Sequence, residues 1–376
     1  MANIIWTAAG LIAVITLFSC IFTSDILRLM DTPSDIFSMS YDYLIVMFGG
    51  MIFTMFYNVL SAILRALGDT KTPLVVLAIA AALNVAFDLL FVVVFGMGVS
   101  GAAYATILAQ FISAFLCLIY MIRRLPLLRF GAQDASPNAG MIGRLLAVGA
   151  PMGLQFSITA IGSVMLQAAV NGHGTNLVAA ITTGDKVANI FWLIMDSVGA
   201  TMAFFCAQNL GAGRIDRVRQ GVRDAFLINM AVGLLSAGII LLLGREMAML
   251  FLGNIPEILA LCDDYLFIKG IFIFTLGPLT VWRNSVQGLG YSAPAMTAGL
   301  MELLARGISA FFFADNLTVL YLASPLAWIA ADFFLVIACY VAIHHLQKTC
   351  RPPDHTTPAP SEQEMAADPA GLSLPG

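Results

Sequence analysis

The sequence predicts an all-α integral membrane protein whose ten spanning helices form two related bundles, one of four helices and one of six. Three observations predict this fold: an apolar composition, long apolar segments and an internal repeat. Apolar residues make up 60% of the 376 residues and charged residues only 11%, whereas soluble domains carry charge on about a quarter of their positions. Several apolar segments reach the ~18 residues that indicate a membrane span. Since hydrocarbon offers backbone groups no hydrogen-bond partner, and these long runs lack the alternation of barrel strands, we expect helices.

Taken in order, the apolar runs define ten predicted spans. The clearest runs extend from Ile4 to Thr23, from Pro73 to Val94 and from Phe226 to Leu243. The first run lacks a basic leading region and an Ala-x-Ala-like cleavage site, so it does not resemble a signal peptide. The full set of predicted spans is 3–27, 38–63, 73–95, 102–122, 147–170, 178–206, 225–252, 259–281, 294–314 and 319–345.

Basic residues fall almost entirely on one side of this arrangement. The side of the membrane on which the loops after odd-numbered spans lie holds only Arg28 and, near a span end, Arg245. The positive-inside rule therefore places the opposite side, and both termini, in the cytoplasm. The basic residues of the predicted cytoplasmic side are Arg65, Lys71, Arg123, Arg124, Arg129, Arg144, Arg214, Arg217, Arg219, Arg223, Arg283, Lys348 and Arg351.

The spans and loops divide the chain into four parts. Residues 1–128 form a lobe of four spans and residues 147–348 a lobe of six, joined by a basic cytoplasmic linker that contains Gly and Pro, 129–146. Residues 349–376 are rich in Pro, Ala and acidic side chains, and we expect a disordered cytoplasmic tail. Between the second and third spans, glycine permits a tight turn at Gly68, and Asp69 and Thr70 can cap the next helix.

The two lobes carry an internal repeat at a shift of 222 residues. Span spacing matches over four consecutive spans, and a repeat with an even number of helices has the same topology in both halves. In secondary transporters such repeats place the substrate site between the halves. The register also puts the counterparts of two C-lobe helices before Met1, so the first lobe is two helices short of the second. The matched positions are Asp42-Tyr43-Leu44 with Asp264-Tyr265-Leu266, Leu67-Gly68 with Leu289-Gly290, and Cys117 with Cys339.

Five segments together resemble the MATE family of multidrug and toxic compound extrusion transporters. They are NVLSAILRALGDTKTP at 58–73, NVAFD at 84–88, GVSGAAYAT at 98–106, AQNLGAGR at 207–214 and PLAWIA at 325–330. The resemblance covers residues 1–348. It implies twelve helices in two six-helix lobes with a V-shaped cavity between them, and efflux driven by H⁺ or Na⁺. On that pattern this chain begins at the third helix and lacks the first two, including the acidic residue of the first.

Asp88 is the leading candidate for a functional residue. An ionised carboxylate within a span costs roughly 2.5–3.5 kcal/mol, so such a residue usually faces protein or water and has a role. Asn84 lies on the same helix face and can hydrogen-bond the carboxyl group or help coordinate Na⁺. The resemblance implies that this pair and Thr106 form a cation site, with Tyr43 as a weaker addition. The alternative is an interhelical hydrogen bond of structural value alone.

A second group of charged residues lies in the C-lobe spans. Glu302 and Arg306 share a helix face, which suits either an ion pair that eases insertion or a transport role. Asp185 can line a C-lobe cavity, and its neighbour Lys186 points to a different face. Asp196, Lys269 and Asp332 can each line the same cavity, and snorkelling toward an interface is an alternative explanation for Lys269.

These observations favour a cation-coupled antiporter that exports amphipathic or cationic small molecules by alternating access, and they favour no enzyme. No catalytic triad, zinc spacing or phosphate-binding loop is present in the sequence, and a net charge of −4 suggests no nucleic-acid partner. We expect no cofactor besides H⁺ or Na⁺, no metal beyond Na⁺ at Asp88 and Asn84, and a lipid-embedded monomer in a bacterial cell membrane. Two alternatives remain: a non-transporting remnant with a truncated or misassigned start, and a flippase for lipid-linked oligosaccharides.

Overall fold

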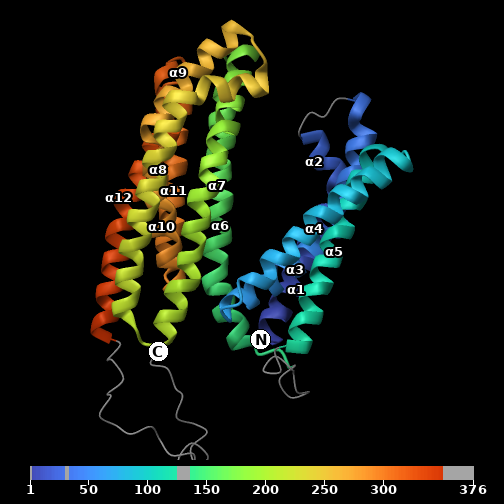
Figure 1. Cartoon of the computed structure of the whole chain (residues 1–376), viewed down its shortest axis with the longest axis vertical. Helices are drawn as coiled ribbons and strands as arrows, with labels where there is room; N and C mark the ends of the chain where they lie inside the picture. The colour runs from blue at the N-terminus through green and yellow to red at the C-terminus, as the bar shows by residue number, and fades with distance from the viewer. Residues whose placement is uncertain (1, 30–33, 125–135, 350–376) are drawn as a thin grey trace, which may run out of the picture. The chain divides into compact units, whose positions relative to one another are not determined.

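The computed structural model describes residues 2–29, 34–124 and 136–349, and these residues fold into helices without a strand (Figure 1). Residues 350–376 of the predicted tail and residues 129–135 of the predicted linker lie outside the described residues. The elements are α1 (Ala2–Ile21), α2 (Thr23–Leu29), α3 (Ser34–Ala66), α4 (Lys71–Asp88), η1 (Leu89–Val94), α5 (Gly98–Arg124), α6 (Ala139–Asn171), α7 (Thr175–Gly211), α8 (Ile215–Leu252), α9 (Pro256–Phe272), η3 (Ile273–Thr275), α10 (Leu276–Gly288), α11 (Ser292–Phe312) and α12 (Leu317–Thr349).

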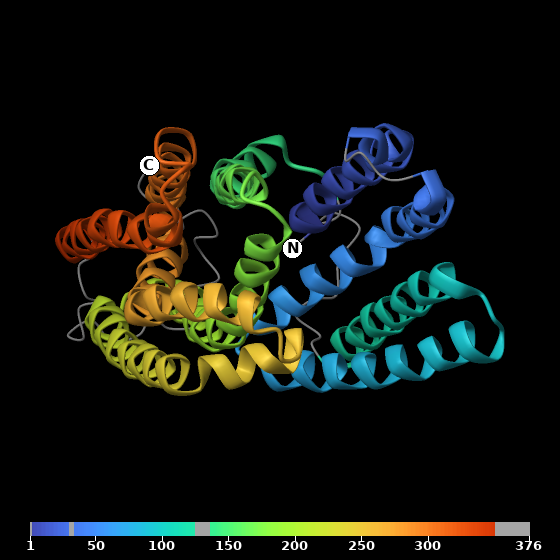
Figure 2. The ribbon, with the colours of Figure 1, turned by 90° about the horizontal axis from the view of Figure 1, so that it is seen from above.

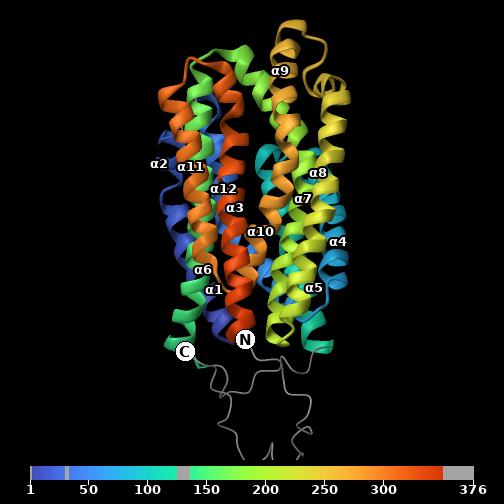
Figure 3. The same ribbon diagram turned by 90° about the vertical axis from the view of Figure 1, so that its left-hand side faces the viewer.

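The chain divides into two compact units at the bond between Ala150 and Pro151, within α6. In the first unit α3 packs against α1 and α5, and α4 and α5 form a hairpin of adjacent helices (Figure 2). In the second unit α7 packs against α8 and α10, and α11 lies beside α12 (Figure 3). The all-α membrane fold and its division into two helical bundles are therefore as predicted.

Nine helices of the described residues are long and apolar enough to cross a membrane, one fewer than predicted. The missing continuous span is 259–281, which the structure divides into α9, the 3₁₀ turn η3 and α10. Pro278 gives the physical reason, because proline has no N–H to donate to the carbonyl of Phe274 four residues earlier. The broken segment still extends from Pro256 to Gly288, so it takes the place of the tenth helix.

Several helices extend beyond their predicted spans on the side that carries the basic residues. Helix α8 begins at Ile215 rather than 225, because Val218 and Val222 lie four residues apart on one helix face and are buried in the core of the second unit. Helix α6 begins at Ala139, inside the predicted linker, where the Asn138 side chain accepts a hydrogen bond from the backbone N–H of Met141. Hydropathy detects the membrane-embedded part of a helix and not these polar extensions.

The internal repeat is confirmed by the helix bounds and by one turn. The shift of 222 residues carries α3, Ser34–Ala66, onto the whole of α9–α10, Pro256–Gly288. Gly68 and Gly290 then correspond, and both have positive φ, 89° and 87°. The N–H of each donates to a carbonyl three residues earlier at 3.0 Å. The two halves thus share a helix register and the turn that follows it.

The turn after α3 also holds the start of α4. The Asp69 carboxylate accepts hydrogen bonds from the backbone N–H of Thr72 at 3.0 Å and from its hydroxyl at 2.7 Å. These bonds hold the pKa of Asp69 below its usual value. The predicted cap by Asp69 is confirmed, whereas the Thr70 side chain makes no capping hydrogen bond.

Close helix packing in the second unit brings α7 and α10 together. A Cβ added at Gly199 of α7 would lie 2.7 Å from Cβ of Thr280 and 2.9 Å from its backbone, and one added at Gly288 would lie 2.3 Å from the Ala203 carbonyl oxygen. Only glycine permits this approach.

Candidate functional site

The second unit contains a polar cavity of about 560 Å³. Six helices contribute to its wall, from Gln155 and Thr159 on α6 to Trp328 on α12. Its charged lining residues come from α7, α9, α10 and α11, and they are Asp185, Asp196, Lys269, Arg283, Glu302 and Arg306. Of the C-lobe residues predicted from the sequence, Asp185, Asp196, Lys269, Glu302 and Arg306 line this one cavity, and Asp332 does not.

Glu302 is the centre of a buried ion cluster and is only 2% exposed. One of its carboxylate oxygens accepts from Arg306 Nη2 at 3.3 Å, which confirms the predicted contact between residues one helical turn apart. The other oxygen is paired with Arg283 of α10. Arg306 Nη1 also donates to the backbone carbonyl of Thr159 at 3.3 Å, which ties α11 to α6. Two guanidinium groups on one carboxylate leave this cluster with one excess positive charge.

The structure corrects the location predicted for Arg283. The sequence predicts a cytoplasmic loop at this residue, because the predicted span ends at 281. Helix α10 continues to Gly288, and the Arg283 side chain is 16% exposed and lines the cavity. Its Nε is buried without a hydrogen bond among the described residues. Arg283 is thus the charged cavity residue that the sequence analysis missed, and no local sequence pattern pairs it with Glu302, which lies on another helix.

A second ion pair joins α7 to α9. The Asp185 carboxylate accepts a hydrogen bond from the Tyr265 hydroxyl at 2.5 Å and is paired with the Lys269 ammonium group. Lys269 Nζ also donates to the Tyr265 hydroxyl oxygen at 2.7 Å and lies 4.9 Å from the centroid of that ring. At 5.9 Å from the Trp328 centroid, it faces a second aromatic ring. Lys269 is 7% exposed, so the suggestion that it snorkels to an interface was wrong.

Asp196 differs from the other acidic residues of the cavity. It is half-buried on α7 and makes no hydrogen bond or ion pair within the part of the chain that the structure describes. Asp185 and Glu302, by contrast, are both paired with basic side chains. Asp196 therefore carries the carboxylate most available to a molecule in the cavity.

The predicted cation site of the first unit is brought together in part. Asn84 Nδ2 donates to Thr106 Oγ1 at 3.4 Å, across α4 and α5, and that hydroxyl donates to the Ala102 carbonyl at 3.0 Å. Asp88 lies one turn further along α4, immediately before the π-helical turn η1, and its Oδ1 is buried with no hydrogen-bond partner among the described residues. Tyr43, on α3, makes no hydrogen bond to these three residues.

The chemistry of this set suits a small cation. The Asp88 carboxylate and the neutral oxygens of Asn84 and Thr106 are hard ligands of the kind that Na⁺ prefers, and among the described residues no hydrogen bond joins Asp88 to the other two. Across the described residues no group of three or more His, Cys, Asp or Glu side chains is placed to hold a metal ion. Helix π-turns often occur at functional positions, and η1 follows Asp88 directly.

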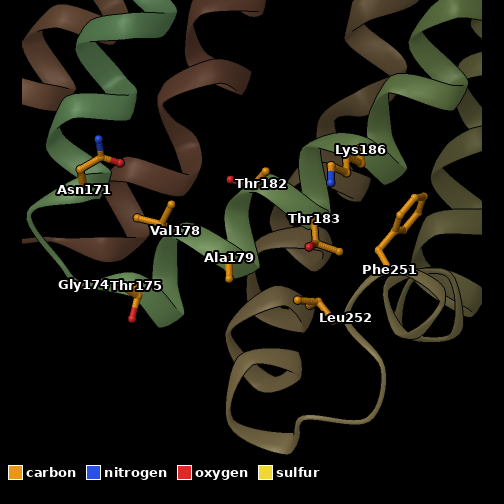
Figure 4. A pocket seen from close by; sticks show the side chains of 10 residues that line it. All are labelled: Asn171, Gly174, Thr175, Val178, Ala179, Thr182, Thr183, Lys186, Phe251 and Leu252. Atoms are coloured by element: carbon orange, nitrogen blue, oxygen red, sulfur yellow. The ribbon is translucent and has the colours of Figure 1, made fainter. Parts of the chain in front are cut away.

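A second pocket of about 570 Å³ lies where the ends of α6 and α8 meet the first turns of α7 (Figure 4). Lys186 lines it, with Nζ 5.9 Å from the centroid of the Phe251 ring. Asp185 and Lys186, neighbours in sequence, line different cavities, which agrees with the prediction that they point to different faces. The lining residues are Asn171, Gly174, Thr175, Val178, Ala179, Thr182, Thr183, Lys186, Phe251 and Leu252.

Two repeated sets of membrane-spanning helices with charged groups inside them define the architecture of a secondary transporter. The family model MatE matches residues 1–90 and 151–312, and the chain belongs to this family of multidrug and toxic compound extrusion transporters. It is therefore a multi-pass membrane protein and not an enzyme.

Three curated relatives illustrate this membership. The chain is 31% identical over 277 residues to the probable multidrug resistance protein YpnP of Bacillus subtilis, over 74% of this chain and 62% of that protein. It is 29% identical to YoeA, a probable multidrug resistance protein of the same organism, over 64% of this chain and 53% of that protein. A protein of Shewanella oneidensis named FAD transporter is 23% identical over 92% of this chain and 76% of its own length. The chain thus spans between half and two thirds of the length of YpnP and YoeA.

Solved structures agree on the fold. A crystal structure described as MATE in the bent conformation has a TM-score of 0.85 at 20% identity and covers 93% of this chain and 79% of that one. A transporter of the MOP superfamily from Pyrococcus furiosus, described as having a binding pocket of reverse polarity, has a TM-score of 0.84 at 19% identity and covers 92% of this chain and 79% of that one.

Proposed function

We propose that this protein is an antiporter that couples the entry of H⁺ or Na⁺ to the export of amphipathic or cationic small molecules by alternating access. The observation that carries the proposal is the buried, unpartnered Oδ1 of Asp88 beside the Asn84–Thr106 hydrogen bond. A buried carboxylate oxygen without a partner is costly, and binding a proton or Na⁺ would remove that cost. Asp88 is then the group that loads and releases the coupling ion.

The cavity of the second unit is proposed as the place where the substrate binds. Asp196 offers an unpaired carboxylate to a cationic group, and Phe156, Trp192 and Trp328 offer aromatic surface to the apolar part of the molecule. The excess positive charge of the Glu302 cluster is less accessible, since Arg283 and Arg306 are largely buried. This difference favours cations over an anionic substrate such as the one named for the Shewanella relative.

The names of the two Bacillus relatives, both probable multidrug resistance proteins, support export of varied small molecules. We further propose a monomer in a bacterial cell membrane with both termini in the cytoplasm. The distribution of basic residues supports that orientation.

Asp88→Asn tests the coupling role. We expect it to abolish gradient-driven efflux of a cationic fluorescent dye from proteoliposomes, because an amide cannot exchange a proton and coordinates Na⁺ weakly. Imposing a pH gradient and a Na⁺ gradient separately would identify the coupling ion. The matched control is Asp42→Asn, which removes an exposed carboxylate from the same unit. Undiminished efflux in Asp88→Asn, at equal membrane insertion, would rule the proposal out.

A further inference from the structure

The repeat relates the predicted cation site of the first unit to the charged cavity of the second. A shift of 222 residues carries Tyr43, Asn84, Asp88 and Thr106 onto Tyr265, Arg306, Ala310 and Trp328. The second unit therefore has no carboxylate at the position of Asp88. Instead, two of these four positions, Tyr265 and Trp328, surround an ammonium group that the chain itself supplies.

That ammonium group belongs to Lys269, and its surroundings are those of a bound alkylammonium ion. It is paired with the Asp185 carboxylate, donates to the Tyr265 hydroxyl oxygen at 2.7 Å and lies within 6 Å of the Tyr265 and Trp328 ring centroids, at 4.9 and 5.9 Å. A carboxylate together with aromatic rings at this range is how proteins recognise ammonium ligands. We call Asp185, Tyr265 and Trp328 the ammonium cage.

The Tyr265 wall of the ammonium cage makes contacts that do not involve the lysine. A Cβ added at Gly184 would lie 2.5 Å from Cδ1 of Tyr265, so the ring packs directly on the α7 backbone. The Tyr265 ring also meets Tyr321 edge-on, with centroids 5.4 Å apart. Its hydroxyl donates to the Asp185 carboxylate at 2.5 Å, so these contacts favour a site that keeps its form without the lysine, and preorganised sites bind ligands at low ordering cost.

We propose that the second unit contains an alkylammonium-binding site that Lys269 occupies permanently as a tethered cation. This unit then takes no cation from solution at that site, and the ion-dependent step belongs to the first unit alone. The assignment of the ion-dependent step to the first unit rests on the proposed function, whereas the site itself does not. Removal of the lysine side chain should open the site to a free primary alkylammonium ion.

The test is binding of n-propylammonium to the purified full-length Lys269→Ala variant. Binding is measured as a rise in the thermal unfolding midpoint of that variant. All variants carry Asp88→Asn, so that the first unit contributes no cation binding, and potassium chloride keeps the ionic strength constant. We expect propylammonium to raise the midpoint saturably by about 2–4 °C. Lys269→Arg, which keeps a tethered cation, should show no such rise. The Lys269→Ala/Asp185→Asn double variant, which lacks the carboxylate, should also fail to respond.

No saturable rise in Lys269→Ala, or an equal rise in the double variant, would overturn the proposal. If Lys269→Ala cannot be purified in plain buffer, its recovery as monodisperse protein with propylammonium but not with potassium chloride supports the site. Failure in both solutions overturns it, because propylammonium bound in an open site would stabilise the folded variant. The readout needs no transport, so the proposed function can fail separately in the dye-efflux assay.

Discussion

Glu302 shows how a charged residue can be both buried and stable within a membrane-spanning bundle. Its two carboxylate oxygens are each bound by a guanidinium group, from Arg283 and Arg306, and the three side chains connect α10 with α11. A buried charge is tolerated when it is paired and hydrogen-bonded, and removing one partner leaves the other charges without compensation. The cluster therefore acts as a unit.

Glu302→Gln should destabilise the protein more than any loss of a surface ion pair. The amide leaves two buried guanidinium groups without their directly paired carboxylate, and we expect a loss of about 3–5 kcal/mol. The measurement is the thermal unfolding midpoint of the purified protein. The control is Asp216→Asn, which breaks the exposed Arg214–Asp216 pair and should leave the midpoint near that of the wild type. Equal midpoints for the two variants would contradict a structural role for the Glu302 cluster.

At the scale of single residues, the sequence predicted which side chains carry charge inside the spans, except for Arg283, but not how they pair. The i, i+4 contact between Glu302 and Arg306 follows from helical spacing alone. The pairs Asp185–Lys269 and Arg283–Glu302 join different helices. They depend on helix rotation and on close approach at glycines, and no local pattern in the sequence records these features.

At the scale of helices, the spans were predictable because hydrocarbon requires long apolar segments. The exceptions have local causes. The break in α9–α10 follows from Pro278, whose kinking effect depends on whether neighbouring helices satisfy the freed carbonyl. The early start of α8 at Ile215 depends on two buried valines in an otherwise polar stretch, which a hydropathy average conceals.

Glycines decide how closely the helices approach, and one pair of variants tests this directly. An alanine at Gly199 of α7 would place its Cβ 2.7 Å from Thr280 Cβ, whereas an alanine at Gly238 of α8 would meet no atom within 4 Å. We expect Gly199→Ala to lower stability by about 1–3 kcal/mol through overpacking. Gly238→Ala should leave it unchanged or raise it by up to about 1 kcal/mol, since alanine is the better helix former. Thermal unfolding of both variants measures the difference, and effects of the same sign would contradict the close α7–α10 packing.

At the scale of the whole molecule, the repeat explains why the two units share a framework but not a chemistry. The helix bounds and the turns at Gly68 and Gly290 are equivalent, because backbone geometry sets them. The side chains at equivalent positions differ, as Asn84 and Arg306 show. A sequence repeat therefore predicted the architecture of both halves, and the contents of each site required the structure.

The orientation of the chain in the membrane is the property that one topology experiment can test. The turn between α7 and α8 and the first turns of α8 carry four arginines, whereas the turn after α8 carries none, so the positive-inside rule places the first in the cytoplasm and the second outside. In intact cells, a membrane-impermeant maleimide should label Asn254→Cys, after α8, and should label Asp216→Cys only once the membrane is permeabilised. Both positions are exposed. Cys20 and Cys350 are replaced by serine, and the other four native cysteines are buried and should not react. Labelling of Asp216→Cys in intact cells would show that the chain has the opposite orientation. The basic loops would then lie outside the cell, contrary to the positive-inside rule.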